Sequence, residues 1–264
     1  MYRQHFGLRC APLDKDATSL WDDGAIAHLH ERFQWLLTSP GVGLLTGEPG
    51  VGKTAALRHI TRSLNPHRYQ VIYTAESDFG RIDLYRALAR ELGLEPSYRR
   101  ADLWRAIKLR ITELAQNRQV LPVWVIDESQ NLPPAFFRDL PAFLNFAMDA
   151  RDLITIWLAG HPSLADVLER APYAALYGRI QVRVHFTAVI ERERFAQLIG
   201  HALAAAGCNH TLLSDSGIEQ LREASRGVPR QAGRILRNAM RLAVPKGLNH
   251  IPDDLLLRAI EEVR

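Results

Sequence analysis

Cysteine and long apolar runs are scarce in this sequence, and each scarcity excludes a class of protein. Its 264 residues include only two cysteines, Cys10 and Cys208, and no CxxC or Cys/His cluster. We therefore expect neither a disulfide framework nor a zinc site, and a cytoplasmic protein with reduced thiols. The longest apolar run, residues 120–126, contains Pro122, whereas a membrane-spanning helix needs about 20 apolar residues. The first residues lead into no apolar stretch typical of a secretory signal.

Charge of one sign is in small excess, and the excess is local. The chain has 33 Lys and Arg residues against 29 Asp and Glu residues, a net charge of +4. Residues 81–110 hold eight basic and four acidic residues, so the net charge of this segment equals that of the whole chain. A basic segment favours an anionic partner such as nucleic acid. Hydrophobic residues make up 47% of the chain, which argues against disorder as the dominant state.

Two patterns of hydrophobic residues divide the chain. Short apolar runs predict strands at residues 42–46, 70–75, 120–126, 153–159 and 180–186. Helical spacing predicts helices around them, at residues 24–38, 53–64, 82–93, 102–116, 134–149 and 163–170. This alternation indicates an α/β core with a parallel sheet covered on both faces. Beyond residue 186 every predicted element is a helix, at residues 190–206, 214–225, 229–243 and 252–263. We expect an N-terminal segment 1–39, irregular over residues 1–21, a core 40–187 and a helical lid 188–264.

A glycine-rich loop follows the first predicted strand and precedes a helix. The segment Gly47-Glu48-Pro49-Gly50-Val51-Gly52-Lys53-Thr54 satisfies the GxxxxGK[ST] pattern. Glycines let backbone N–H groups turn inward around an anion, and the helix N-terminus adds a partial positive charge. Lys53 can reach the β- and γ-phosphates of a nucleotide, and the Thr54 hydroxyl can bind Mg²⁺. The loop and Ala55 therefore predict a nucleotide site, and a structural glycine turn is the alternative. The sequence has no NKxD tetrapeptide, the motif that reads guanine, so we expect ATP rather than GTP.

Two carboxylates end the third predicted strand. Asp127 and Glu128 follow the apolar residues 123–126. In a chain with a phosphate loop, Asp127 is expected to hold Mg²⁺, directly or through water. Glu128 is expected to orient or deprotonate the attacking water. Solvated acids at a strand end are the alternative, but the pair favours hydrolysis over transfer to a small molecule.

The loop and the acidic strand resemble those of an AAA+ ATPase, and further segments are similar to its ExeA-type branch. These segments are Phe6-Gly7-Leu8, Asp127-Glu128-Ser129-Gln130-Asn131-Leu132, Leu158-Ala159-Gly160-His161-Pro162-Ser163-Leu164, Gly178-Arg179-Ile180-Gln181-Val182-Arg183 and Gly227-Val228-Pro229-Arg230. Together they cover nearly the whole chain in the family's order. The resemblance implies a three-layer P-loop NTPase core with a five-stranded parallel sheet, followed by a small all-α lid.

The same branch implies what the protein does. It contains secretion ATPases, which carry a membrane helix and an envelope-binding region after the lid, and transposition ATPases similar to MuB, IstB and TnsC. The sequence ends at Arg264 with neither, so the resemblance implies a transposition helper with no membrane partner. Such a protein binds ATP and Mg²⁺, oligomerises on non-specific double-stranded DNA as a ring or filament, and stimulates a transposase. A secretion or envelope-assembly ATPase, and a nucleotide switch or loader adaptor with little turnover, remain alternatives.

The resemblance also implies roles for three residues outside the loop and the acidic pair. His161 matches a sensor position at the end of the fourth strand, where the family more often has Gln or Asn; a turn histidine is the alternative. Arg179 matches the arginine finger that reaches a neighbouring subunit's nucleotide, with Arg183 as second choice and a surface arginine as the alternative. Arg230 matches the lid arginine of the GxPR motif, expected to close on ATP.

DNA contact is expected on the basic segment 81–110, where the resembling transposition proteins place their DNA-contacting elements. Phosphate contacts need Arg or Lys without reading bases, which suits a protein that binds many targets. The candidates are Arg81, Arg99, Arg100, Arg105 and Lys108. Solvated helix faces balanced by nearby acids are the alternative. No helix-turn-helix module follows the predicted lid, so sequence-specific readout is not expected.

Overall fold

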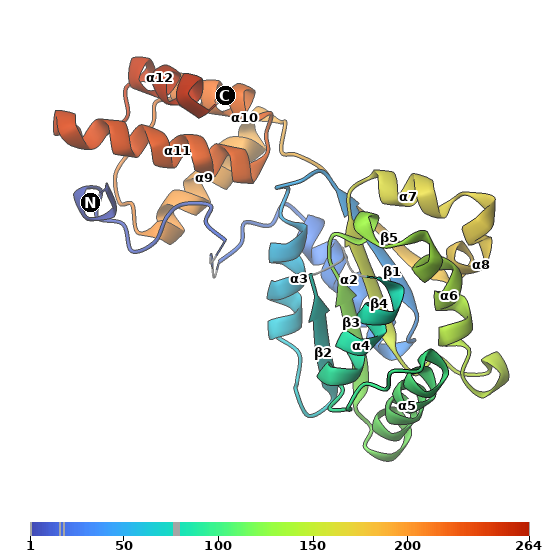
Figure 1. Cartoon of the computed structure of the whole chain (residues 1–264). Coiled ribbons are helices and arrows are strands. Elements are labelled where there is room, and N and C mark those ends of the chain that lie inside the picture. The colour runs from blue at the N-terminus through green and yellow to red at the C-terminus, as the bar shows by residue number, and fades with distance from the viewer. Residues whose placement is uncertain (1, 16, 18, 76–79, 264) are drawn as a thin grey trace. The chain divides into compact units, whose positions relative to one another are not determined.

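A computed structural model describes residues 2–15, 17, 19–75 and 80–263 (Figure 1). The chain divides into two compact units. The helical unit comprises Met1–Ala25, Glu48–Ala55 and Thr187–Arg264, and the sheet unit comprises Ile26–Gly47 and Ala56–Phe186.

A five-stranded sheet forms the centre of the sheet unit, which confirms the predicted fold class. Its strands are β1 (Val42–Gly47), β2 (Tyr69–Thr74), β3 (Leu121–Ile126), β4 (Thr155–Gly160) and β5 (Ile180–Phe186). They lie in the order β2-β3-β4-β1-β5, and every neighbouring pair is parallel. Their carboxyl ends therefore share one edge of the sheet, and their amino ends share the opposite edge.

Burial follows the position of each strand in the sheet. The inner strands β1, β3 and β4 are buried along nearly their whole length, as expected for a parallel sheet covered on both faces. The edge strand β5 alternates buried and exposed residues. Pro122 is the second residue of β3 and lies opposite Gln70 of β2, before the pairing with β4 begins at Val123. A proline is tolerated there because few ladder hydrogen bonds depend on its missing N–H.

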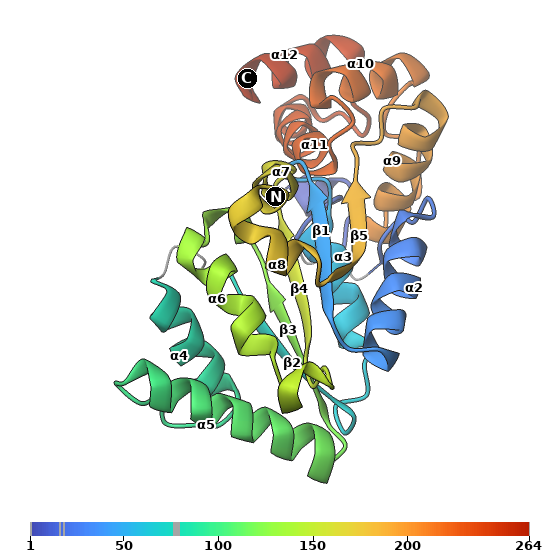
Figure 2. The ribbon, with the colours of Figure 1, turned by 90° about the vertical axis from the view of Figure 1, so that its right-hand side faces the viewer.

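Helices cover both faces of the sheet, as Figure 2 shows, with α2 and α3 on one side and α4, α6 and α8 on the other. These elements, with α5 and α7, are α2 (Ala25–Thr38), α3 (Lys53–Arg62), α4 (Arg81–Glu91), α5 (Arg100–Thr112), α6 (Pro134–Leu144), α7 (Ser163–Leu168) and α8 (Ala174–Tyr177). On the first face Phe33 stacks on Trp157, with ring centroids 5.1 Å apart. On the second face Trp124 packs against Tyr85 and Phe136. The unit is thus the three-layer arrangement that the sequence predicted.

Two short irregular helices extend these elements, and one predicted helix is shorter than expected. Glu113–Asn117 continues α5 as a π-helix, and Ser129–Asn131 forms a 3-10 turn after β3. The helix predicted over residues 134–149 ends at Leu144. Pro141 lies inside it and cannot donate a backbone hydrogen bond, which weakens the helix near its end. The chain then forms a loop closed by a bridge between Phe146 and Arg151.

The helical unit packs five helices around its own apolar core. They are α1 (Tyr2–His5), α9 (Arg192–Ala206), α10 (Asp215–Ser225), α11 (Pro229–Ala243) and α12 (Asp253–Val263). The lead-in predicted as irregular is wrong in part, because α1 forms and Phe6 and Leu8 are buried in this core. The Arg9 N–H also donates to the Ala206 carbonyl at 2.8 Å. Apolar side chains just after α1 therefore dock the N-terminus onto the helices.

Candidate functional site

The glycine-rich loop forms a tight turn between β1 and α3. Gly50 and Gly52 have φ values of 91° and 104°, a backbone region that other residues rarely adopt. The turn directs the chain into α3, which begins at Lys53. The Lys53 side chain is buried, and its ammonium donates to the Glu48 carbonyl at 3.1 Å. The loop thus places a cation and a helix N-terminus together, the combination that binds a phosphate.

The start of α11 lies against this loop within the helical unit. The Arg230 N–H donates to the Gly50 carbonyl at 3.3 Å. A Cβ atom at Gly50 would lie 2.8 Å from Arg230 Cβ and 3.0 Å from Val228 Cγ1, so the contact leaves no room for a side chain. The GxPR arginine and the phosphate loop are therefore direct neighbours. Gly50 is required both for its backbone conformation and for this close approach.

Asp127 is a buried carboxylate with oriented oxygens at the carboxyl end of β3. It is 3% exposed. Its Oδ1 accepts the Glu128 N–H at 2.9 Å, and its Oδ2 accepts the Tyr73 hydroxyl of β2 at 3.0 Å. Burial, and next the charge of Asp127, raise the pKa of Tyr73 far above its usual range. Tyr73 therefore remains a neutral donor that fixes the orientation of the carboxylate.

Glu128 is more exposed than Asp127, and one glutamine holds its side chain. Glu128 has left-handed backbone angles, φ 50° and ψ 36°, which turn the chain sharply at the end of β3. The Gln130 amide donates to Glu128 Oε2 at 2.7 Å. The Gln130 oxygen accepts the backbone N–H of His161 at 3.0 Å. Sequence reasoning quoted Gln130 within a motif but assigned it no role; a polar side chain one short turn after the carboxylates was the available signal.

The sheet brings several of the predicted residues to one edge. Thr46 of β1 lies opposite Gly160, the last residue of β4, and β3 ends at Ile126 opposite Leu158, so the three strands end near one another. We call this the carboxyl edge: Gly47, Asp127, Glu128, Gln130 and His161. The His161 ring lies 3.0 Å from the Ser163 hydroxyl through Nδ1. The other predicted nucleotide-contacting residues fall in the helical unit and include Lys53, Thr54 and Arg230.

Arg179 lies at the opposite edge of the sheet. It precedes β5, whose first residue pairs with Val42 at the start of β1. Its guanidinium lies 2.8 Å from both carboxylate oxygens of Asp149. Asp149 belongs to the loop after α6, where three successive residues, 147–149, have φ between 48° and 64°. The second candidate finger, Arg183, donates to the Tyr177 carbonyl at 3.2 Å and lies over that ring at 4.3 Å.

The basic segment divides into paired and exposed side chains. Arg81 of α4 and Arg100 of α5 both bind Asp139 of α6, at 3.0 and 2.8 Å. The Lys108 ammonium donates to the Asn145 carbonyl and lies 4.9 Å from the Phe146 ring centroid, and burial lowers its pKa. Arg99 and Arg105 are exposed, and no carboxylate lies within ion-pair distance of either in the described part of the chain. These two keep their charge available to a partner.

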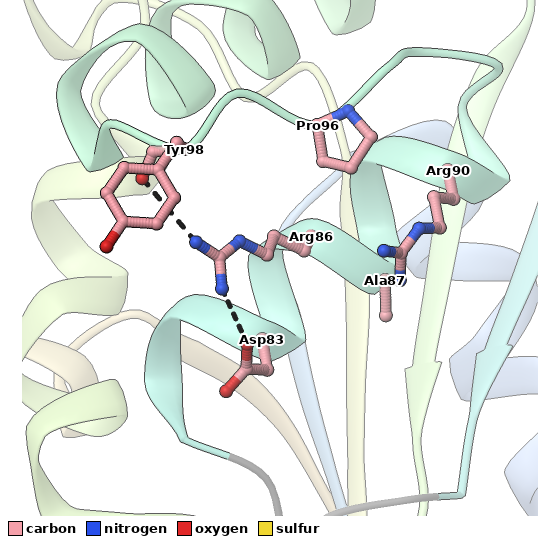
Figure 3. Close-up of a pocket in the computed structure, with 6 residues that line it drawn as sticks. All are labelled: Asp83, Arg86, Ala87, Arg90, Pro96 and Tyr98. Carbon is pink, nitrogen blue, oxygen red and sulfur yellow. Dashed lines mark hydrogen bonds and ion pairs between the residues drawn. The ribbon is translucent and has the colours of Figure 1, made fainter.

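A shallow pocket of about 430 Å³ opens on the same segment (Figure 3). Its lining residues come from α4 and the connection to α5: Asp83, Arg86, Ala87, Arg90, Pro96 and Tyr98. Arg86 donates to Asp83 at 2.9 Å, and its guanidinium lies 5.7 Å from the ring centroid of Tyr98. Tyr98 is 89% exposed. Two arginines one helical turn apart, beside an open aromatic ring, extend the basic surface of Arg99.

Comparison with known proteins places this fold in a family. A family model described as an AAA domain matches residues 37–168, which is 132 of the 264 residues. Among solved structures, Cdc6p from Pyrobaculum aerophilum has a TM-score of 0.72 and 18% identity, covering 99% of this chain and 71% of that one. The ORC1 protein of Aeropyrum pernix, solved in complex with DNA, has a TM-score of 0.73 and 18% identity, covering 95% and 68%. These likenesses show the fold.

A curated relative covers the chain end to end. General secretion pathway protein A of Aeromonas hydrophila is 28% identical over 270 residues, which cover 99% of this chain and 48% of the relative. The chain thus spans about half the length of that relative, and the match supports the ExeA-like branch. Among the described residues, no helix combines the length and apolar character needed to cross a bilayer. Because the family model matches half of its length, the chain belongs to the AAA domain family of P-loop proteins.

Proposed function

We propose that the protein hydrolyses ATP, assembles through ATP on double-stranded DNA, and regulates a transposase during target selection. The observation that carries the ATPase part is the set of residues at the carboxyl edge. Two carboxylates follow directly after β3; one is buried and held by two donors, and the other is anchored by a single amide. A fixed, buried Asp127 suits a metal ligand, and a more exposed Glu128 beside it suits a general base.

Residues of the phosphate loop and the buried carboxylate fit ATP and Mg²⁺. The glycine turn and the start of α3 offer backbone N–H groups to phosphate oxygens, and Lys53 adds its ammonium. Thr54 and Asp127 would hold Mg²⁺ with oxygen ligands of the kind that it prefers, and the bound cation would offset charge on the phosphates. Gly47 to Ala55 would line the nucleotide, and Arg230, which already touches Gly50, would close on it.

Glu128 is proposed to carry the proton in the hydrolytic step. It orients a water and accepts its proton as the water oxygen attacks the γ-phosphorus, and the bond to the β,γ-bridging oxygen breaks to give ADP and phosphate. We propose that His161 offers a polar contact to the γ-phosphate or the water. Its backbone is tied to the Glu128 side chain through Gln130.

Arg179 is proposed to complete the site of a neighbouring copy. Strands rise roughly 3.3 Å per residue, so the six residues of β1 separate the two sheet edges by about 17 Å. This span is far longer than an arginine side chain, so Arg179 cannot serve the carboxyl edge of its own sheet. A guanidinium supplied by the next subunit would make hydrolysis depend on assembly. To reach that neighbour, Arg179 must leave Asp149.

The DNA part of the proposal depends on the basic face of α4 and α5. All five candidates, Arg81, Arg99, Arg100, Arg105 and Lys108, remain proposed contacts, but their surroundings rank them. Arg99 and Arg105 are exposed, whereas Arg81 and Arg100 share Asp139. Phosphate contacts by exposed arginines give binding without sequence preference. One neighbour of similar fold, the ORC1 protein, was solved in complex with DNA, which supports DNA as the proposed partner.

The transposase and the DNA assembly are tested together. Fluorescence anisotropy of labelled duplex DNA, with ATP, ADP or no nucleotide, should show tight binding with ATP alone. Electron microscopy of the same mixtures with a slowly hydrolysed ATP analogue should show rings or filaments on the DNA. A cognate transposase should then accelerate ATP hydrolysis. DNA binding that ignores the nucleotide, or is absent, would contradict the proposal.

The secretion-pathway relative favours a second candidate. An ATPase of secretion or envelope assembly would follow from the 28% identity to General secretion pathway protein A. It predicts association with an envelope partner and no response of hydrolysis to DNA. The measurements above separate the two candidates, because they share the ATPase site and differ in the DNA effect.

A further inference from the structure

We propose that Gln130 is a positioning residue that holds Glu128 in its working orientation and links it to the end of β4. This inference deepens the proposed ATPase function and rests on it. The residue belongs to the short turn after β3, three positions beyond the buried Asp127. We propose no contact between Gln130 and the nucleotide; its effect is exerted through the carboxylate of Glu128.

Both ends of the Gln130 carboxamide are used. Its Nε2 donates to Glu128 Oε2 at 2.7 Å, and its Oε1 accepts the His161 N–H at 3.0 Å. A carboxylate is acceptor-only, and a backbone N–H is donor-only. Only a side chain with one donor and one acceptor can join these two groups. The amide therefore fixes one Glu128 oxygen and leaves the other to face a water.

The fold reserves space for this amide. A Cβ atom on Gly160, the last residue of β4, would lie 2.5 Å from Gln130 Oε1. It would also lie 3.1 Å from Leu164 Cδ2. Gly160 does not have a positive φ, so its lack of a side chain answers a need for space. The missing side chain at Gly160 therefore gives the Gln130 oxygen room to make its hydrogen bond to the His161 N–H.

Glu128 needs such an anchor because it is exposed. An exposed glutamate samples several rotamers, and only a fraction of them can orient a water for attack. Misplacement of a reacting group by about 1 Å can cost up to about 100-fold in rate. The link to the His161 backbone also means that movement of the turn after β4 moves the general base.

Three variants separate the two contacts of Gln130. Gln130→Ala removes both. Gln130→Glu keeps an acceptor for the His161 N–H but loses the donor to Glu128, and places a like charge beside it. Gly160→Ala leaves Gln130 intact but fills its space. Asn131→Ala is the matched control, because this neighbouring side chain is exposed and no hydrogen bond from it occurs in the described structure.

Steady-state hydrolysis and ATP binding are measured for each variant. We expect Gln130→Ala, Gln130→Glu and Gly160→Ala to lower kcat by about 10- to 100-fold with KM and the ATP Kd nearly unchanged. Asn131→Ala should match the unmodified protein. A Gln130→Glu variant with the kcat of the unmodified protein would overturn the inference.

A double-mutant cycle tests whether Gln130 acts through Glu128. In single-turnover assays, Gln130→Ala added to Glu128→Gln should cause no further loss of rate. A further loss as large as in the unmodified background would contradict a positioning role and indicate a general structural one. If the unmodified protein hydrolyses no ATP, the proposed function fails instead. The inference alone fails when hydrolysis is normal and insensitive to Gln130.

Discussion

The two edges of the five-stranded sheet present opposite chemistry. At the carboxyl edge, the two acidic side chains that follow β3 are oriented by Tyr73 and Gln130. At the amino edge, the guanidinium of Arg179 precedes β5 and is held by Asp149. The first edge carries the groups proposed to activate water, and the second carries the cation proposed to stabilise charge on a phosphate. If the proposed roles hold, one copy carries two parts of a site that its own sheet keeps apart.

Substitution of Arg179 should have the largest effect, because it removes the proposed contribution of the amino edge. Arg179→Ala should lower ATP hydrolysis by at least about 10³-fold, because an arginine finger stabilises the charge of the transition state. Arg183→Ala is the comparison variant, because this arginine lies four residues further along, in β5, and its guanidinium lies over the ring of Tyr177 in α8. Phosphate release at saturating ATP measures both. A larger loss for Arg183→Ala would transfer the role to Arg183.

Loss of Glu128 tests the carboxyl edge. Glu128→Gln should lower hydrolysis by about 10²- to 10³-fold, because the amide cannot accept the proton of the water. ATP binding and assembly on DNA should persist, since Lys53 and the phosphate loop are intact. Size-exclusion chromatography with ATP and DNA should show a long-lived assembly. Unchanged turnover would instead support a switch without catalysis.

Removal of the two exposed arginines tests the basic face without touching either edge. Arg99→Ala with Arg105→Ala should weaken DNA binding about tenfold at moderate salt and reduce the slope of log K against log salt by about one to two. Arg62→Ala with Arg258→Ala removes the same charge from other exposed positions and is the control. Equal effects of both pairs would indicate a response to net charge alone.

Breaking the ion pair between Arg179 and Asp149 should have the smallest effect, and that effect is on assembly. A partly exposed ion pair contributes about 0.2–1 kcal/mol, so Asp149→Asn should favour assembly by at most about fivefold. The protein concentration at half-maximal hydrolysis should fall accordingly, while kcat at high concentration stays the same. Asp166→Asn on α7 serves as a charge-matched control, and an equal shift there would contradict a specific role for Asp149.

The sequence predicted the strands, their parallel arrangement and the helical C-terminal part, because apolar periodicity and glycine-rich turns are local signals. It overestimated α6 by five residues, because apolar spacing does not register the weakening by Pro141 or the turn closed by the Phe146–Arg151 bridge. It also missed α1, whose following residues Phe6 and Leu8 are buried in a core shared with residues far along the chain, including those of α9 to α12.

Site residues divide in the same way. The phosphate loop and the acidic pair could be proposed from the sequence because the chemistry expected of them depends on a fixed local spacing. The bond from Gln130 to the His161 backbone spans 31 positions and depends on β3 and β4 being neighbours. The sharing of Asp139 by Arg81 and Arg100 likewise needs α4, α5 and α6 to meet. No pattern along the chain signals such tertiary partners.

Mixing two inactive variants tests most directly whether ATP is hydrolysed between copies. Glu128→Gln retains a working Arg179, and Arg179→Ala retains a working carboxyl edge. In an equal mixture, about a quarter of head-to-tail interfaces combine the two intact parts. The account predicts that the mixture hydrolyses ATP well above either variant alone, towards a quarter of the rate of the unmodified protein. A mixture no more active than the mean of its two components would contradict it.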